Sequence, residues 1–163
     1  NGVRIARKIG MTSYRSANEW VQRFGRKKSV ENKINQNTFG IENTSFEFEI
    51  ESYLEHQAVK FQNIFDANCY LYLSRAMDWF DVASLGKSSL EAFSKINVNK
   101  ALVLGVDTDI LFPPQQQKEI AENLSLSNVK VEYKELNCIQ GHDSFLADTG
   151  IFAKEISSFI KNL

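Results

Sequence analysis

The feature that most constrains the fold of this chain is an unbroken apolar segment, ALVLGV, at residues 101–106. A strand that is buried on both faces has this composition, whereas a half-exposed antiparallel strand alternates apolar and polar side chains. The segment therefore predicts a strand in a parallel sheet. Pro113 and Pro114 then open a predicted helix, PPQQQKEIAENL, because the first turn of a helix needs no amide donor from proline.

A second strand and a final helix come next along the chain. VKVEYKEL at residues 129–136 alternates Val129, Val131 and Tyr133 with charged side chains, a pattern typical of a strand nearer the edge of a sheet. IFAKEISSFIKNL places its apolar side chains on one helical stripe. Residues 97–163 thus predict the strand–helix–strand–helix ending of an α/β domain, with a parallel sheet and flanking helices.

The chain changes character near residue 97, because the part before it has helical patterns. ESYLEHQAVKFQNIF and ANCYLYLSRAMDWF repeat apolar side chains at intervals of three and four residues. SLEAFSKI predicts a third helix, with Ser89 as its cap. Residues 27–45 are polar, lack a period and predict a loop. The predicted organisation is a helical region at residues 1–96, followed by the α/β region at residues 97–163.

Two polar residues follow the two predicted strands. Asp109 comes just after the first strand, and His142 comes after the second. Sheets of this kind carry their sites outside the carboxyl ends of the strands. The order acid then histidine matches the last two members of the Ser…Asp…His triad of α/β-hydrolases. An aspartate in such a position is more often a turn former or a helix cap, so both interpretations of Asp109 stay open.

The sequence contains no obvious nucleophile for this pair. A nucleophile elbow requires G-x-S-x-G between a strand and a helix, and no serine here lies between two glycines in that way. GKSSL at residues 86–90 is the nearest match, and it also resembles the end of a phosphate-binding loop. Asp81 occupies the position of the glycine that such a loop requires, and no buried strand precedes it. We interpret Gly86 as a turn between two helices.

Composition and charge exclude several classes of function. The net charge of −1 and an isoelectric point near 6.2 leave no basic surplus for binding a nucleic acid. No segment approaches the roughly 20 apolar residues that a membrane span needs. Cys69 and Cys138 lie far apart without metal-type spacing, which predicts no metal site and favours a reducing, cytoplasmic compartment. The basic cluster RFGRKK is interpreted as a solvated loop, with an anion site as the alternative.

Several longer stretches resemble one known family. GVRIARKIGMTSYRS, EWVQRFGR, FEIESYLEHQAVKFQNIFDANCYLYLSRAMDWFDV, DTDILFPPQQQKEIAENL and GHDSFL together are similar to the C-terminal portion of the homoserine O-acetyltransferase family. The resemblance implies an α/β-hydrolase fold in which the helical region forms a lid. It also implies transfer of an acetyl group from acetyl-CoA to the side-chain hydroxyl of L-homoserine through an acyl-serine. Acetyl-CoA is then a substrate, and we expect no bound cofactor.

The resemblance assigns site residues motif by motif. Asp109, in D-x-L-F-P, matches the triad aspartate, and His142, in G-H-D-x-F, matches the triad histidine. Asp143 matches the residue expected to hold the amino group of the substrate. Arg7, in A-R-x-I-G-M, matches the arginine expected to hold its carboxylate, and Tyr14, in S-Y-R-S, matches a pocket tyrosine. Arg7 lies in a basic stretch, so a solvated side chain is the alternative for it.

The resemblance also implies partners. The nucleophilic serine would come from the N-terminal part of the same enzyme, outside this chain, and we expect a homodimer built through the lid. We expect acyl donor and amino-acid acceptor as small-molecule partners, and neither a nucleic acid nor a membrane. The acceptor stays open, because serine or deacetylcephalosporin C could replace homoserine, and succinyl could replace acetyl. A catalytically inactive fragment with a binding or structural role is the alternative from a different class.

Overall fold

The computed structural model describes residues 2–29, 47–62 and 64–163. Its helices and strands, in chain order, are α1 (Gly2–Tyr14), α2 (Ala17–Arg23), α3 (Glu49–Gln62), α4 (Ala67–Trp79), the 3-10 helix η1 (Val82–Leu85), α5 (Ser89–Ser94), β1 (Lys100–Val106), α6 (Pro114–Leu126), β2 (Lys130–Leu136), the 3-10 helix η2 (Gly141–Asp143), α7 (Ser144–Ala147) and α8 (Thr149–Lys161). The predicted loop at residues 27–45 lies almost entirely outside the described residues.

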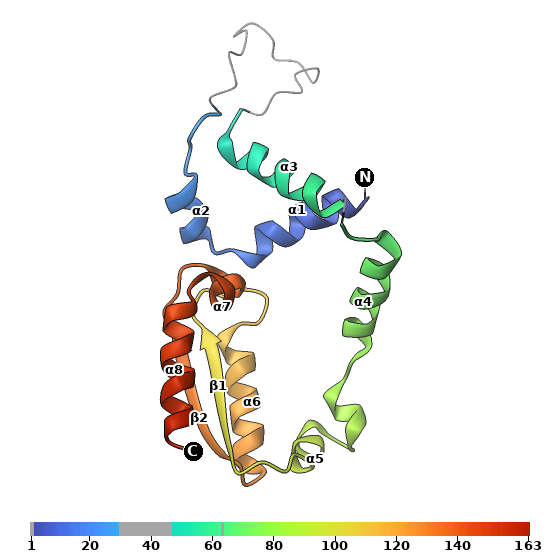
Figure 1. The fold of residues 1–163 in the computed structure, drawn as a ribbon. Coiled ribbons are helices and arrows are strands. Elements are labelled where there is room, and N and C mark those ends of the chain that lie inside the picture. The colour runs from blue at the N-terminus through green and yellow to red at the C-terminus, as the bar shows by residue number, and fades with distance from the viewer. Residues whose placement is uncertain (1, 30–46, 63) are drawn as a thin grey trace, which may run out of the picture.

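The two predicted strands pair with each other in parallel. β1 and β2 run in register from Lys100 opposite Lys130 to Val106 opposite Leu136, and α6 makes the crossover between them. Figure 1 shows α6 and α8 on opposite sides of these strands. The prediction of a parallel sheet with flanking helices is therefore confirmed for this part of the chain.

Each face of the sheet has its own small core. On the α6 side, Val103 of β1 packs with Ala121 and Leu124 of α6. On the α8 side, Val106 and Leu136 pack with the buried side chain of Cys138. The partly buried side chains of Leu104, Ile151 and Phe152 pack against this cluster. Alternate residues of β1 thus point into different cores, as a strand covered on both faces requires.

Side-chain caps begin several helices. Asp66 accepts hydrogen bonds from the amides of Asn68 and Cys69 at 2.9 and 3.0 Å, which starts α4. The prediction of Ser89 as the cap of α5 was wrong by one residue, because the hydroxyl of Ser88 accepts from the Glu91 amide at 3.2 Å. A serine three residues before the amide is the one that reaches it.

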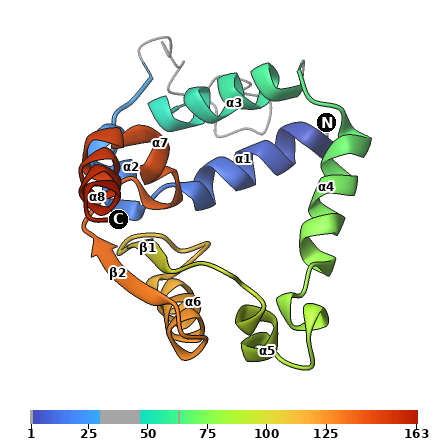
Figure 2. The same ribbon diagram turned by 60° about the horizontal axis from the view of Figure 1, so that its bottom comes forward.

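The N-terminal helices lie over the carboxyl ends of the strands. α1 and α3 pack together, and Arg4 and Lys8 of α1 both form ion pairs with Glu55 of α3. The turn between α1 and α2 lies against η2, while α4 leads away to α5 at the opposite end of the sheet (Figures 1 and 2). None of the helices in the described part of the chain is long and apolar enough to cross a membrane.

Many large apolar side chains are exposed in this structure. On α4, Tyr72, Met77 and Trp79 are 77%, 70% and 73% exposed. On α8, Ile156 and Ile160 of the predicted apolar stripe are 44% and 59% exposed. The described residues therefore bury only part of the apolar surface that the sequence patterns place on these helices.

An ion pair between β2 and α8 makes stability depend on pH. Lys134 lies within salt-bridge distance of Glu155, and also 3.1 Å from Glu132. The hydrogen bond from Lys134 lowers the pKa of Glu155 below its ordinary value of 4.5. The hydrogen bonds to Glu155 and Glu132 raise the pKa of Lys134 above 10.5. The ion pair therefore makes its full contribution to stability between pH 4.5 and pH 10.5, the ordinary pKa values of the two groups.

We predict that Glu155→Gln weakens the loss of stability at low pH. In the wild type, the contribution of Glu155 is present above pH 4.5 and is lost as the pH falls through the lowered pKa. The free energy of unfolding is measured by denaturant titration at pH 7 and at pH 3. From pH 7 to pH 3 it should fall less in Glu155→Gln than in the wild type. Glu122→Gln, at an exposed position of α6, is the control. An equal pH dependence in the wild type and Glu155→Gln would contradict the prediction.

Candidate active site

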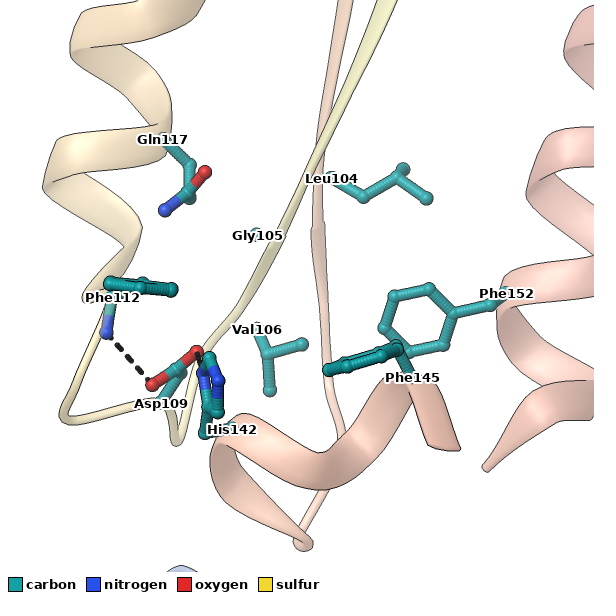
Figure 3. A pocket seen from close by; sticks show the side chains of 9 residues that line it. All are labelled: Leu104, Gly105, Val106, Asp109, Phe112, Gln117, His142, Phe145 and Phe152. Atoms are coloured by element: carbon teal, nitrogen blue, oxygen red, sulfur yellow. Dashed lines mark hydrogen bonds and ion pairs between the residues drawn. The ribbon is translucent and has the colours of Figure 1, made fainter. Parts of the chain in front are cut away.

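The carboxyl ends of β1 and β2 bring Asp109 and His142 together. Because Val106 lies opposite Leu136, the loops that follow the two strands begin at the same edge of the sheet. Oδ2 of Asp109 lies 3.0 Å from Nδ1 of His142. The side chains are only 10% and 22% exposed, so water screens the pair weakly. Figure 3 shows the carboxylate and the imidazole next to each other. The two residues are separated by 33 positions in the sequence.

The two oxygens of the Asp109 carboxylate have different partners. Its Oδ1 accepts hydrogen bonds from the amides of Leu111 and Phe112, both at 2.9 Å, which forms the turn before α6. Its Oδ2 remains for the imidazole of His142. The turn fixes the plane of the carboxylate, because an ionised carboxylate has acceptors only and each oxygen already has a defined partner. The same residue therefore forms the turn and orients the histidine.

The contact with Asp109 determines which nitrogen of His142 is available. An ionised carboxylate accepts from Nδ1–H, so Nε2 of the neutral ring carries the lone pair. An imidazole held in this way can take a proton at Nε2 while the carboxylate stabilises the imidazolium that forms. This arrangement suits general acid–base chemistry on a hydroxyl group.

Aromatic rings surround the imidazole. The ring centroid of Phe112 lies 4.9 Å from that of His142 in an edge-to-face arrangement, and those of Tyr14 and Phe145 lie 5.6 and 6.1 Å away. A pocket of about 380 Å³ opens beside the pair. Its lining consists of Leu104, Gly105, Val106, Asp109, Phe112, Gln117, His142, Phe145 and Phe152 (Figure 3).

The pocket follows one edge of β1. Three consecutive residues of the strand, Leu104 to Val106, line it, together with Gln117 of α6 and Phe152 of α8 from the two helical layers. β2 pairs with β1 along the other edge, and it contributes no residue to this lining. The pocket is therefore a slot beside the edge of β1 that has no partner strand among the described residues, and His142 lies at the carboxyl end of this edge.

Arg7 and Tyr14 line a second pocket, of about 260 Å³, between α1, α3 and α4. The guanidinium of Arg7 lies 4.9 Å from the centre of the Phe61 ring, and its buried Nε has no hydrogen-bond partner among the described residues. Tyr14 belongs to this pocket and also contacts the ring of His142. The structure thus places Tyr14 between the two pockets, and Arg7 only in the second.

Asp143 forms an ion pair with Arg15, to which no sequence motif assigned a role. Its Oδ2 lies 3.0 Å from Nε of Arg15, and Nη1 of Arg15 lies 2.9 Å from Oε1 of Glu19. All three side chains are less than a fifth exposed. Asp143 therefore connects the histidine loop to the start of α2. No sequence signal pointed to Arg15, because its partner lies 128 positions away along the chain and forms no motif with it.

The turn between α1 and α2 fits closely against the histidine loop. Gly141 has a φ of +67°, and a Cβ at this position would lie 2.9 Å from both the Ser16 nitrogen and the Tyr14 oxygen. Any other residue would clash there and would also be strained. The hydroxyl of Ser16 donates to the carbonyl of Ile139. The turn between α1 and α2 and the loop before His142 are consequently in direct backbone contact.

Two nucleophile-type side chains lie near His142 in the sequence, and neither is suited to attack. Ser144 is fully buried, and its hydroxyl donates to the Gly141 carbonyl at 2.6 Å. Burial raises the pKa of the Cys138 thiol, and Asp148 and Asp107 raise it further. A buried thiol with a raised pKa supplies little of the thiolate that would react.

Comparison with known proteins gives curated relatives over nearly the whole chain. Serine O-succinyltransferase of Litchfieldella anticariensis is 48% identical over 98% of the chain. The proteins of the same name from Xylella fastidiosa M12 and Stenotrophomonas maltophilia K279a are 46% and 44% identical over 100% of it. The chain spans 42% to 43% of the length of these relatives. A scan of family models gave no match.

Solved structures share the fold. Homoserine O-acetyltransferase from Bacillus anthracis matches with a TM-score of 0.79 at 19% identity, over 97% of this chain and 40% of that one. The esterase E22 matches with a TM-score of 0.76 at 22% identity, over 98% of this chain and 42% of that one. These matches identify the structure as a partial α/β-hydrolase fold. The curated relatives confirm the resemblance to this group of O-acyltransferases that the sequence motifs indicate, and the chain matches less than half of the length of each of them.

Proposed function

We propose that this chain supplies the acid, the base and the acceptor pocket of an O-acyltransferase that acts on the side-chain hydroxyl of a small amino acid. The observation that carries the proposal is the 3.0 Å contact between Asp109 and His142 at the carboxyl ends of two parallel strands. The names of the curated relatives favour serine as acceptor and succinyl as the transferred group. Homoserine and acetyl, which the sequence motifs imply, are the second pair.

The proposed reaction has two halves, and in each half Nε2 of His142 takes up one proton and gives it back. Nε2 of His142 takes the proton of a nucleophilic serine hydroxyl, whose oxygen then attacks the carbonyl carbon of an acyl-CoA thioester. The C–S bond breaks, the thiolate takes the proton, and an acyl-serine remains. In the second half, Nε2 takes the proton of the acceptor hydroxyl, which attacks the acyl-serine. The proton returns to the serine oxygen as the product ester leaves.

We place the nucleophilic serine in a part of the polypeptide outside this chain. The slot along the free edge of β1 supports this placement, because it is flanked by α6 and α8 and leads to His142. A further strand in that slot would hydrogen-bond to β1 and would end beside the imidazole. Its following turn is where α/β-hydrolases carry the nucleophile.

The second pocket is proposed to take the acceptor. A guanidinium can hold a carboxylate through two parallel hydrogen bonds, and the unpartnered Nε of Arg7 is one available donor. Tyr14 lies between this pocket and His142, so an amino acid held there would direct its hydroxyl toward the base. Asp143 is proposed to attract the amino group. Its ion pair with Arg15 moderates its negative charge.

We predict that His142→Ala lowers kcat for acyl transfer by at least about 100-fold, because general-base catalysis is lost. The measurement is the steady-state rate in the full-length polypeptide, with succinyl-CoA and serine and with acetyl-CoA and homoserine. His56→Ala is the matched control, because His56 is exposed on α3. Near-normal turnover of His142→Ala with every donor and acceptor pair would refute the proposed function.

A second prediction separates the two half-reactions. Arg7→Gln should raise the KM for the amino-acid acceptor about 10- to 100-fold, since a hydrogen-bonded charge contact is lost. Acyl-enzyme formation without acceptor, followed by mass spectrometry, should stay within a few-fold of the wild type. Arg4→Gln, which changes another arginine of α1 and removes its ion pair with Glu55 of α3, is the control. Equal damage to both half-reactions in Arg7→Gln would indicate a structural role instead.

A further inference from the structure

The position of His142 depends on a loop rather than on a strand. β2 ends at Leu136, and residues 137–140 lead to the short 3-10 helix that carries the imidazole. A loop of this kind has no sheet hydrogen bonds of its own, so side chains from elsewhere must determine its path. The 3.0 Å contact between Asp109 and His142 is therefore only as well defined as the contacts that hold this loop.

Two residues beside Asp109 make those contacts. Oδ1 of Asp107 accepts from the Cys138 amide at 3.1 Å, near the start of the loop. The hydroxyl of Thr108 donates to the carbonyl of Cys138 and accepts from the amide of Gly141 at 3.2 Å. Thr108 thus joins both ends of the segment from Cys138 to Gly141, immediately before the histidine.

A hydroxyl is well suited to this position. One oxygen atom must donate to a carbonyl and accept from an amide at the same time, and a hydroxyl does both. Cys138 and Gly141 are buried, so their backbone groups cannot turn to bulk water if this partner is lost. A valine at position 108 would have nearly the same shape as threonine. It would leave the Cys138 carbonyl and the Gly141 amide without the hydrogen bonds of the hydroxyl.

Other contacts to the loop come from different directions. Ser16 holds the Ile139 carbonyl from the lid, and Ser144 holds the Gly141 carbonyl from the start of α7. Neither residue belongs to the segment that carries Asp109. Thr108 is next to Asp109 in the chain and bonds to the amide of the residue next to His142, so it connects the two loops directly.

From this geometry we infer that Thr108 is a positioning residue, which holds His142 at hydrogen-bonding distance from Asp109. This inference rests on the proposed function where it concerns catalysis. The claim that the Asp109–His142 contact depends on the Thr108 hydroxyl concerns the fold alone. The two can be tested by separate measurements on the same variants.

The test compares Thr108→Val with Thr108→Ser in the full-length polypeptide. The valine variant should lose about 10- to 100-fold in kcat, as expected for a displacement of a catalytic group by a fraction of an ångström to one ångström. Its KM should stay within about three-fold, because Thr108 lines neither the Arg7 pocket nor the slot along β1. The serine variant keeps the hydroxyl and should retain nearly all activity. Thr149→Val, at an exposed position of α8, is the matched control.

The second measurement does not depend on turnover. An imidazole N–H donated to a carboxylate gives a low-field proton resonance, and the signal that disappears in His142→Ala identifies the resonance of His142. This resonance should be lost in Thr108→Val and kept in Thr108→Ser and Thr149→Val. Thr108→Ala removes the same hydroxyl and replaces the valine variant if that one does not fold.

The outcomes separate the inference from the proposed function. Wild-type kcat together with a persistent resonance in Thr108→Val would overturn the inference, and so would equal losses in the valine and serine variants. A wild-type protein without acyl transfer in any donor and acceptor pair would refute the proposed function. Selective loss of the resonance in Thr108→Val would still support the positioning role in that case.

Discussion

The parallel, in-register pairing of β1 and β2 is the interaction on which the site depends. It places Val106 and Leu136 side by side, so that both following loops leave the sheet at one edge. A crossover helix is needed between parallel strands, which explains why the acid and the histidine are far apart in sequence and adjacent in space. The apolar contacts of α6 and α8 hold this pairing from both faces. Loss of the register by one residue would separate Asp109 from His142.

The histidine loop is held from two sides. The β1 side provides Asp107 and Thr108, which bond to its backbone. The turn between α1 and α2 provides Ser16, which bonds to the Ile139 carbonyl, and Arg15, which pairs with Asp143. The N-terminal helices therefore support the loop that carries His142, and they also line the pocket of Arg7. A change in the α1–α2 turn would act on the position of the imidazole without touching it.

The sequence predicted the two strands, the helices α3 to α6, the helix α8 and the residues Asp109 and His142, because these leave local signals. An apolar run, a helical period and the DTDILFPP motif are all readable over a few residues. The contacts of Arg15 with Asp143 and of Thr108 with Gly141 were not predictable, since they join distant segments through ordinary polar residues. The cap of α5 was misplaced because two adjacent serines, Ser88 and Ser89, have the same chemistry and only the backbone distinguishes them.

The contact between Ser16 and Ile139 closes a loop of 123 positions, which runs from the start of α2 to the loop after β2. The entropy lost in closing a flexible loop grows only logarithmically with its length, so insertions between these two residues add little to that cost. α3 and α4 lie within this loop and line the pocket of Arg7. Changes in the length of the segments that join these helices would therefore add little to the entropic cost of the contact between Ser16 and Ile139.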